Sequence, residues 1–133
     1  MPAILSHLLL EPRLRFARIA LALILYAGVI VGGSIPGARA EVGEFAPGVV
    51  LHGLTYAVLT LLWFFGSTGS GLLRAVKAVL AVALMGAGDE LVQSFLPYRS
   101  GDIRDWMIDM SAALLTSTLL ALAVPRPETA RQP

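Results

Sequence analysis

Four long apolar stretches organise the chain. They run over about residues 16–34, 49–65, 72–96 and 106–124. Each has nearly the 20 or so residues that a helix needs to cross a hydrocarbon core about 30 Å thick. None shows the alternation of polar and apolar positions that marks the strands of a membrane barrel. Because only helices and closed barrels satisfy their backbone hydrogen bonds inside a bilayer, the pattern predicts an all-α, polytopic membrane helix bundle with four transmembrane helices.

Glycine and proline separate these stretches. Residues 32–37 and 66–71 are rich in glycine, while Pro97 and Pro125 follow the third and fourth stretches. Both residue types favour the end of a helix over its continuation at such places. We therefore expect a single transmembrane domain over residues 1–133, with a polar tail over residues 126–133.

Composition excludes several classes of protein. Hydrophobic residues make up 56% of the chain and charged residues 14%, whereas about 25% of an ordinary soluble domain is charged. The net charge of +1 offers no basic surface for nucleic acid, and the absence of cysteine excludes disulfides and thiol catalysis. We expect membrane lipid as a partner, no nucleic acid and no cofactor, and the sequence leaves a homo-oligomer open.

The distribution of Lys and Arg predicts the orientation, because positive residues collect on the cytoplasmic side. One side of the predicted bundle has seven, and the other, formed by segments 35–48 and 97–105, has three. We therefore expect both termini in the cytoplasm. A small-residue motif at positions 38–40 resembles a signal-peptidase site, but the spans that follow favour a first helix that is retained. The seven are Arg13, Arg15, Arg18, Arg74, Lys77, Arg126 and Arg131, and the three are Arg39, Arg99 and Arg104.

Ionisable residues inside the spans are the informative ones, since each costs about 2.5–3.5 kcal/mol at the centre of a membrane helix. Glu90 lies about 10 Å of helix before Pro97, and Asp109 lies about 6 Å after Asp105. His52 lies in the first turns of the second span. All of them therefore fall in one layer, in the half of the membrane away from the cytoplasm.

Spacing places these residues on shared helix faces. His52 with Tyr56 and Asp105 with Asp109 are four apart, and Glu90 with Gln93 are three apart. Lipid penalises such faces, so we expect them to point at one another, with Arg99 closing over them from a short loop. Asp89 is about 100° from Glu90 around the helix and is expected to face away. Glu90 is expected to be the most buried acid.

This layer has more acids than bases. Water-exposed acids, a protonated acid and a bound cation all remain open as explanations. We predict His52 and Glu90 as an acid–base pair, with Asp105 to orient the histidine or the arginine. The ligand-binding group is then Tyr56, Gln93, Arg99 and Asp109. A metal site of His52, Glu90, Asp105 and Asp109 would suit a divalent ion, but no pair has HExxH-type spacing, and we expect no metal.

These motifs resemble the VanZ-like family of bacterial membrane proteins, over roughly residues 47–120. The chain carries the family's His-x3-Tyr at His52, its Glu-x2-Gln at Glu90 and its Arg-x2-Asp-x2-Asp at Arg99. It departs from the family at Gly48, usually an acid, and at Asp109, usually Asn. The resemblance implies a multi-pass protein of the bacterial cytoplasmic (inner) membrane. It also implies a link to cell-envelope chemistry and to resistance to teicoplanin.

The sequence leaves three functions open. The first is an outward-facing polar pocket that recognises or modifies an amphiphilic ligand, either a lipid-linked envelope precursor or a lipoglycopeptide such as teicoplanin. The second is a non-catalytic structural or binding module whose polar cluster only joins helices. The third is a small ion- or proton-coupled transporter, which is disfavoured because residues 78–86 of the third span include no polar side chain. Whether the protein is an enzyme stays open.

Overall fold

The computed structural model describes residues 3–124, and these contain helices and no strand. The predicted all-α fold class is confirmed. The polar tail expected over residues 126–133 lies outside the described residues. In chain order the helices are α1 (Ala3–Leu10), the 3-10 helix η1 (Pro12–Leu14), α2 (Arg15–Gly33), α3 (Ala38–Gly43), α4 (Gly48–Gly66), α5 (Gly71–Ser94) and α6 (Ile103–Ala123).

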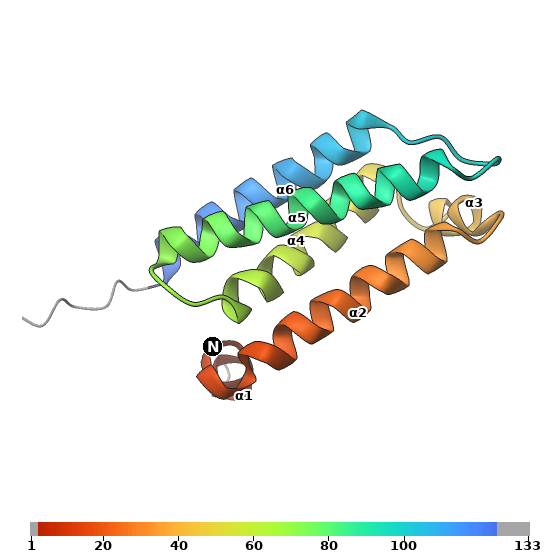
Figure 1. Ribbon diagram of the computed structural model, residues 1–133. Coiled ribbons are helices and arrows are strands. Elements are labelled where there is room, and N and C mark those ends of the chain that lie inside the picture. Colours follow the sequence, from red (N-terminus) through yellow and green to blue (C-terminus); the bar gives the residue numbers. More distant parts are fainter. Residues whose placement is uncertain (1–2, 125–133) are drawn as a thin grey trace, which may run out of the picture.

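The four long helices form an up-and-down bundle in which each runs antiparallel to the next (Figure 1). α4 packs against α2, α5 and α6, and α5 packs against α6. Each of the four is long and apolar enough to span a membrane. Large apolar side chains point away from the bundle, among them Leu84 and Leu122, which are 76% and 80% exposed. Four such helices with apolar outer surfaces are typical of a multi-pass membrane protein.

Capping residues set where two of the helices begin. The Ser70 side chain accepts a hydrogen bond from the Leu73 N–H and starts α5, and Asp102 accepts one from the Arg104 N–H and starts α6. α6 therefore begins three residues before the expected span, and Asp105 lies within its first turn. The segment expected as a plain connection over residues 35–48 contains the short helix α3, entered through Gly37 at φ +82°.

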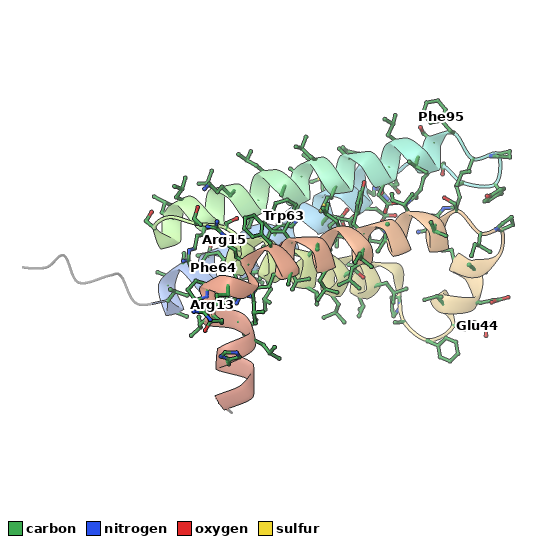
Figure 2. The ribbon with its side chains drawn as sticks, turned by 60° about the horizontal axis from the view of Figure 1, so that its bottom comes forward. Arg13, Arg15, Glu44, Trp63, Phe64 and Phe95 are labelled. Carbon is green, nitrogen blue, oxygen red and sulfur yellow. The ribbon has the colours of Figure 1, made fainter. Side chains whose placement is uncertain are left out.

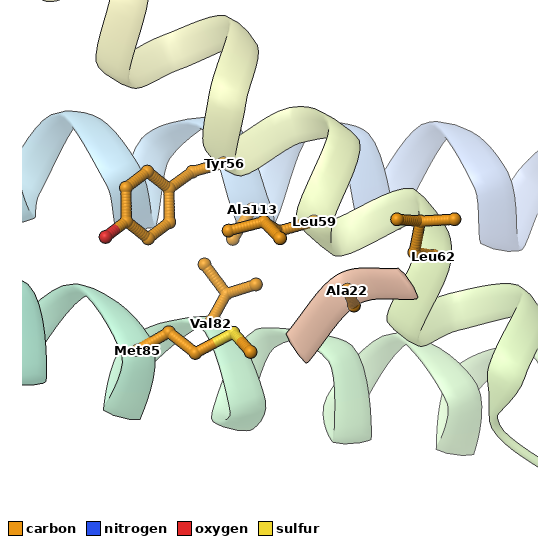
Figure 3. Packing of buried hydrophobic residues seen from close by; sticks show 7 residues of the cluster. All are labelled: Ala22, Tyr56, Leu59, Leu62, Val82, Met85 and Ala113. Carbon is orange, nitrogen blue, oxygen red and sulfur yellow. The ribbon is translucent and has the colours of Figure 1, made fainter. Parts of the chain in front are cut away.

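The centre of the bundle is an apolar core with small residues at the helix crossings (Figure 3). Ala22 of α2 and Ala113 of α6 are fully buried in it. Side chains this small let membrane helices approach closely. Tyr56 belongs to this core and also to the polar layer described below. The remaining members are Leu59, Leu62, Val82 and Met85.

Arg18 joins several helices at the end of the bundle where α2 begins and α4 ends. Its side chain is only 6% exposed. The guanidinium donates to the carbonyl oxygens of Leu8, Glu11 and Phe65 at 2.8, 2.6 and 2.8 Å. It thereby joins α1, η1 and α4 to α2. Arg13 and Arg15 lie at the same end, far from Glu44 and Phe95 at the other (Figure 2).

The contact between α2 and α4 near this end depends on Gly66. A Cβ added there would lie 2.6 Å from Cγ1 of Ile19 and 3.2 Å from the carbonyl oxygen of Arg15. Gly66→Ala is expected to lower the free energy of unfolding by about 1–3 kcal/mol, the usual cost of overpacking. Denaturant unfolding of the chain in micelles measures this change.

Gly53→Ala is the matched control, because Gly53 lies on the same helix and a Cβ there meets nothing within 4 Å. It is expected to leave stability unchanged or to raise it slightly, as alanine favours helix. Equal destabilisation by both substitutions would contradict the close approach of the two helices at Gly66.

Candidate functional site

Polar residues from three long helices meet at the end of the bundle near α3 and the segment 95–102. His52 of α4 joins two carboxylates of α6. Its Nδ1 lies 2.9 Å from Oδ1 of Asp109, in hydrogen-bond contact, and its Nε2 lies 3.7 Å from Oδ2 of Asp105. Asp109 is completely buried. Its hydrogen bond fixes the orientation of the imidazole ring.

Glu90 of α5 lies beside this pair. Its Oε2 accepts a hydrogen bond of 2.5 Å from the backbone N–H of Asp102. Gly101 permits this contact, because a Cβ there would lie 2.7 Å from the carbonyl oxygen of Glu90. Glu90, His52 and Asp109 each present one donor atom within 4.8 Å of the other two. Among the described residues, neither Oε1 of Glu90 nor Oδ2 of Asp109 has a hydrogen-bond partner, and both atoms are buried.

A cavity of about 360 Å³ opens between α2, α3, α4 and α5 on the other side of His52. Among the predicted site residues, His52, Tyr56, Gln93 and Arg99 line it. Glu90, Asp105 and Asp109 do not line it. The predicted cluster is thus divided into cavity-lining residues and acids on the far side of His52. The rest of the lining is Val29, Gly32, Gly33, Ala38, Arg39, Val42, Gly43, Gly48, Leu51, Thr55 and Asp89.

Asp89 faces this cavity, so the expectation that it turns away is wrong. Its side chain is 3% exposed, and the Tyr56 hydroxyl donates to its Oδ2 at 3.5 Å. Asp89 and Gln93 are four residues apart and share one face of α5, while Glu90 faces the start of α6. The expectation that Glu90 is the most buried acid is also wrong, since Asp89 and Asp109 are both less exposed. The i,i+4 spacing of Asp89 and Gln93 was the signal available in the sequence.

Asp105, expected to orient the histidine or the arginine, lies beside His52, and Arg99 has other partners. Arg99 donates to the carbonyl oxygen of Gly33 at 3.1 Å and to Oε1 of Gln93 at 2.5 Å. Arg39 of α3 takes the place beside Asp105, with Nη2 3.5 Å from Oδ2. The sequence did not indicate Arg39 as a site residue, because nothing in segment 35–48 showed that α3 folds back over the bundle. The Arg39 side chain lies over Gly48, which has no side chain of its own. A Cβ added at Gly48 would lie 3.7 Å from the Arg39 guanidinium.

This arrangement brings a histidine to the wall of a cavity and places buried carboxylates behind it. The cavity face offers hydrogen-bond donors and acceptors from Tyr56, Gln93 and Arg99 together with the Asp89 carboxylate. Asp109 holds Nδ1 of this histidine. A histidine held in this way is suited to move a proton or to bind a metal ion at its second ring nitrogen. The cavity residues are suited to bind a polar group.

Comparison with known protein families gives a match to most of this chain. A family model described as VanZ/LLP1 matches residues 19–124, which include every residue of the candidate site. No protein among those with curated functions matches the chain. No solved structure matches it either.

Proposed function

This chain belongs to the VanZ/LLP1 family, as its motifs predicted, and from that premise we propose that its cavity binds an amphiphilic cell-envelope ligand at the outer leaflet. A lipid-linked envelope precursor or a lipoglycopeptide such as teicoplanin has the required chemistry, with a polar head joined to an apolar part. Binding, with or without modification of the ligand, is the proposed activity.

The mixed lining of the cavity carries this proposal. One wall is polar and includes His52, Asp89 and Arg99, while Val29 and Val42 line another part. Small-molecule pockets of about 300–1,000 Å³ commonly combine an apolar lining with a few polar groups that fix orientation. A cavity of about 360 Å³ suits the polar head of such a ligand, and the lipid-facing surface of the helices suits its apolar part.

The distribution of cationic residues between the two ends of the bundle supports an outer-leaflet ligand. The cavity end has three cationic residues, Arg39, Arg99 and Arg104, whereas the described part of the other end has five, which include Arg18 and Lys77. By the positive-inside tendency, the end with fewer cations faces away from the cytoplasm. We therefore place both termini in the cytoplasm and the chain in the bacterial inner membrane.

The roles of the site residues follow their positions. Tyr56, Gln93 and Arg99 contact the ligand, with Arg99 facing its anionic group. If the ligand is modified, His52 at the cavity wall exchanges the proton and Glu90 is its acid–base partner. Asp105 and Asp109 then orient the imidazole from the far side.

A second candidate function rests on a specific observation. The polar groups largely pair with one another, as in His52 with Asp109, Arg39 with Asp105 and Arg99 with Gln93. Such a network would also serve a non-catalytic module whose polar layer only joins helices. A transporter is disfavoured because residues 78–86 of α5 offer no polar side chain toward the cytoplasmic half.

Filling the cavity tests the proposal without touching the polar network. Gly32 lines the cavity, and a Cβ there meets nothing within 4 Å. Gly32→Leu is expected to weaken binding of teicoplanin, or of a lipid-linked glycan precursor, by about tenfold or more, the equivalent of about 1.4 kcal/mol. Ligand titration of the chain in nanodiscs measures affinity, and the teicoplanin susceptibility of expressing cells measures the consequence.

Gly28→Leu is the matched control, because Gly28 lies one turn earlier on α2, is exposed and does not line the cavity. It is expected to bind both probes as the parent chain does. Unaltered binding by Gly32→Leu, or the same loss in both variants, would contradict a ligand in this cavity. If the parent chain binds neither probe, the polar layer is better explained as a joint between helices.

A further inference from the structure

We propose that His52, Glu90 and Asp109 bind one divalent transition-metal ion, of the Zn²⁺ or Mn²⁺ kind, where α4, α5 and α6 meet. This inference goes beyond the proposed function, because Glu90 and Asp109 do not line the cavity and the three residues can bind an ion whether or not the cavity holds a ligand.

The three donor atoms have nearly the separations that one ion requires. One ligand atom from each of the three residues lies within 4.8 Å of the other two. Two donors that each lie about 2.0–2.2 Å from one ion are about 3–4 Å apart. Rotation of the Glu90 side chain, the longest of the three, would close the remaining gap.

Two carboxylates each leave one buried oxygen without a hydrogen-bond partner among the described residues. One oxygen of Glu90 is held by the Asp102 N–H, and one oxygen of Asp109 is held by His52. The second oxygen of each, Oε1 and Oδ2, is buried and has no hydrogen-bond partner among the described residues. Buried polar atoms nearly always have a partner. An ion between the two carboxylates would supply it.

The helix packing also leaves space for the Asp109 carboxylate. A Cβ at Gly86 of α5 would lie 3.0 Å from Oδ2 of Asp109 and 3.1 Å from Cδ1 of Trp106. The Trp106 indole N–H donates to the carbonyl oxygen of Ala83 at 3.1 Å. This hydrogen bond fixes the indole ring next to the Asp109 carboxylate. Glycine at position 86 therefore lets a carboxylate fit between two closely packed helices.

The charge count favours a divalent cation. Four carboxylates lie in this layer, on Asp89, Glu90, Asp105 and Asp109, whereas Arg39 and Arg99 supply two positive charges. With a neutral imidazole, one divalent ion makes the layer neutral, and uncompensated charge is costly at membrane depth. A nitrogen with two carboxylates suits zinc or manganese better than magnesium or calcium, which prefer oxygen ligands alone.

Metal titration of the full chain in detergent micelles tests this inference. After treatment with a chelator, the protein is titrated with Zn²⁺ or Mn²⁺, and retained metal is measured by elemental analysis. We expect about one ion per chain, as for a site with one set of ligands. Asp109→Asn and Glu90→Gln are each expected to weaken binding at least 100-fold or so, since even residues that only support a ligand contribute about 10–100-fold.

Asp89→Asn is the matched control, because it removes the same charge from a buried acid of the same layer that lies outside the three ligands. It lowers the negative charge of the layer without removing a ligand, so it is expected to weaken metal binding by less than about tenfold, against about 100-fold for Glu90→Gln. Circular dichroism and elution volume check that each variant is folded, and Glu90→Gln decides the result if Asp109→Asn does not fold. No retained ion in the parent chain, or equal binding by Glu90→Gln and Asp89→Asn, would overturn the inference.

The metal test and the cavity test have separate outcomes. Gly32→Leu fills the cavity and touches none of the three ligands, so it is expected to bind metal as the parent chain does. Failure of the metal titration leaves ligand binding by the cavity in place. Failure of teicoplanin binding leaves the metal site in place.

Discussion

The double substitution His52→Leu with Asp109→Leu is expected to leave the bundle folded, whereas His52→Leu alone is expected to lower the free energy of unfolding by about 3–5 kcal/mol. Asp109 is completely buried and hydrogen bonds to His52. Removing the histidine leaves an uncompensated carboxylate between α4 and α6. Removing both groups places two apolar side chains at a helix contact, which is often neutral or stabilising.

Denaturant unfolding in micelles that contain a chelator measures both variants against the parent chain. A double variant that is stable but no longer binds ligand would separate function from packing, since the helices would then pack without the polar pair. If the double variant is as unstable as His52→Leu alone, the polar layer is needed for the fold. The structural alternative for this protein would then be preferred.

Arg18→Met is expected to lower the free energy of unfolding by about 1–3 kcal/mol. The substitution removes the donor for three carbonyl oxygens: that of Phe65, which is buried, and those of Leu8 and Glu11, which are part-buried. Each buried polar group left unsatisfied costs about 1–3 kcal/mol. Methionine has a similar length and preserves much of the packing, so the loss reports mainly on these hydrogen bonds.

Arg13→Met separates this effect from a general loss of charge at the same end. Arg13 is exposed and lies five residues earlier, so its substitution is expected to change stability by less than about 0.5 kcal/mol. Unfolding of the two variants under identical conditions gives the comparison. Equal losses would show that positive charge at this end matters more than the carbonyl contacts of Arg18.

The helices were predictable from local features of the sequence. Length and hydropathy determine whether a segment can span a membrane, and both are visible without knowledge of the neighbouring helices. The observed long helices α2, α4, α5 and α6 begin and end within about three residues of the expected stretches. The largest difference arises at Asp102, whose side chain caps α6 and starts that helix earlier than hydropathy indicated. Capping depends on the conformation of one residue, and a hydropathy average over many residues does not detect it.

The convergence of polar residues could be anticipated in outline only. The cost of exposing charge to lipid indicates that such residues turn inward, but it does not say which of two inward directions each takes. α5 has neighbours on both sides. Asp89 therefore faces the cavity beside α2, while Glu90 faces α6. The direction of each side chain depends on how the helix is rotated against its neighbours.

The sequence by itself determined the membrane environment, the helical class and the family, because hydropathy and the spacing of motif residues are both properties of the linear chain. Only the tertiary structure decided that Arg39 lies beside Asp105, that Asp89 lines the cavity and that His52, Glu90 and Asp109 gather within reach of one ion. These contacts join residues of different helices, and their formation depends on the rotation and crossing of whole helices. Close packing at small residues sets that geometry, and no local pattern in the chain records it.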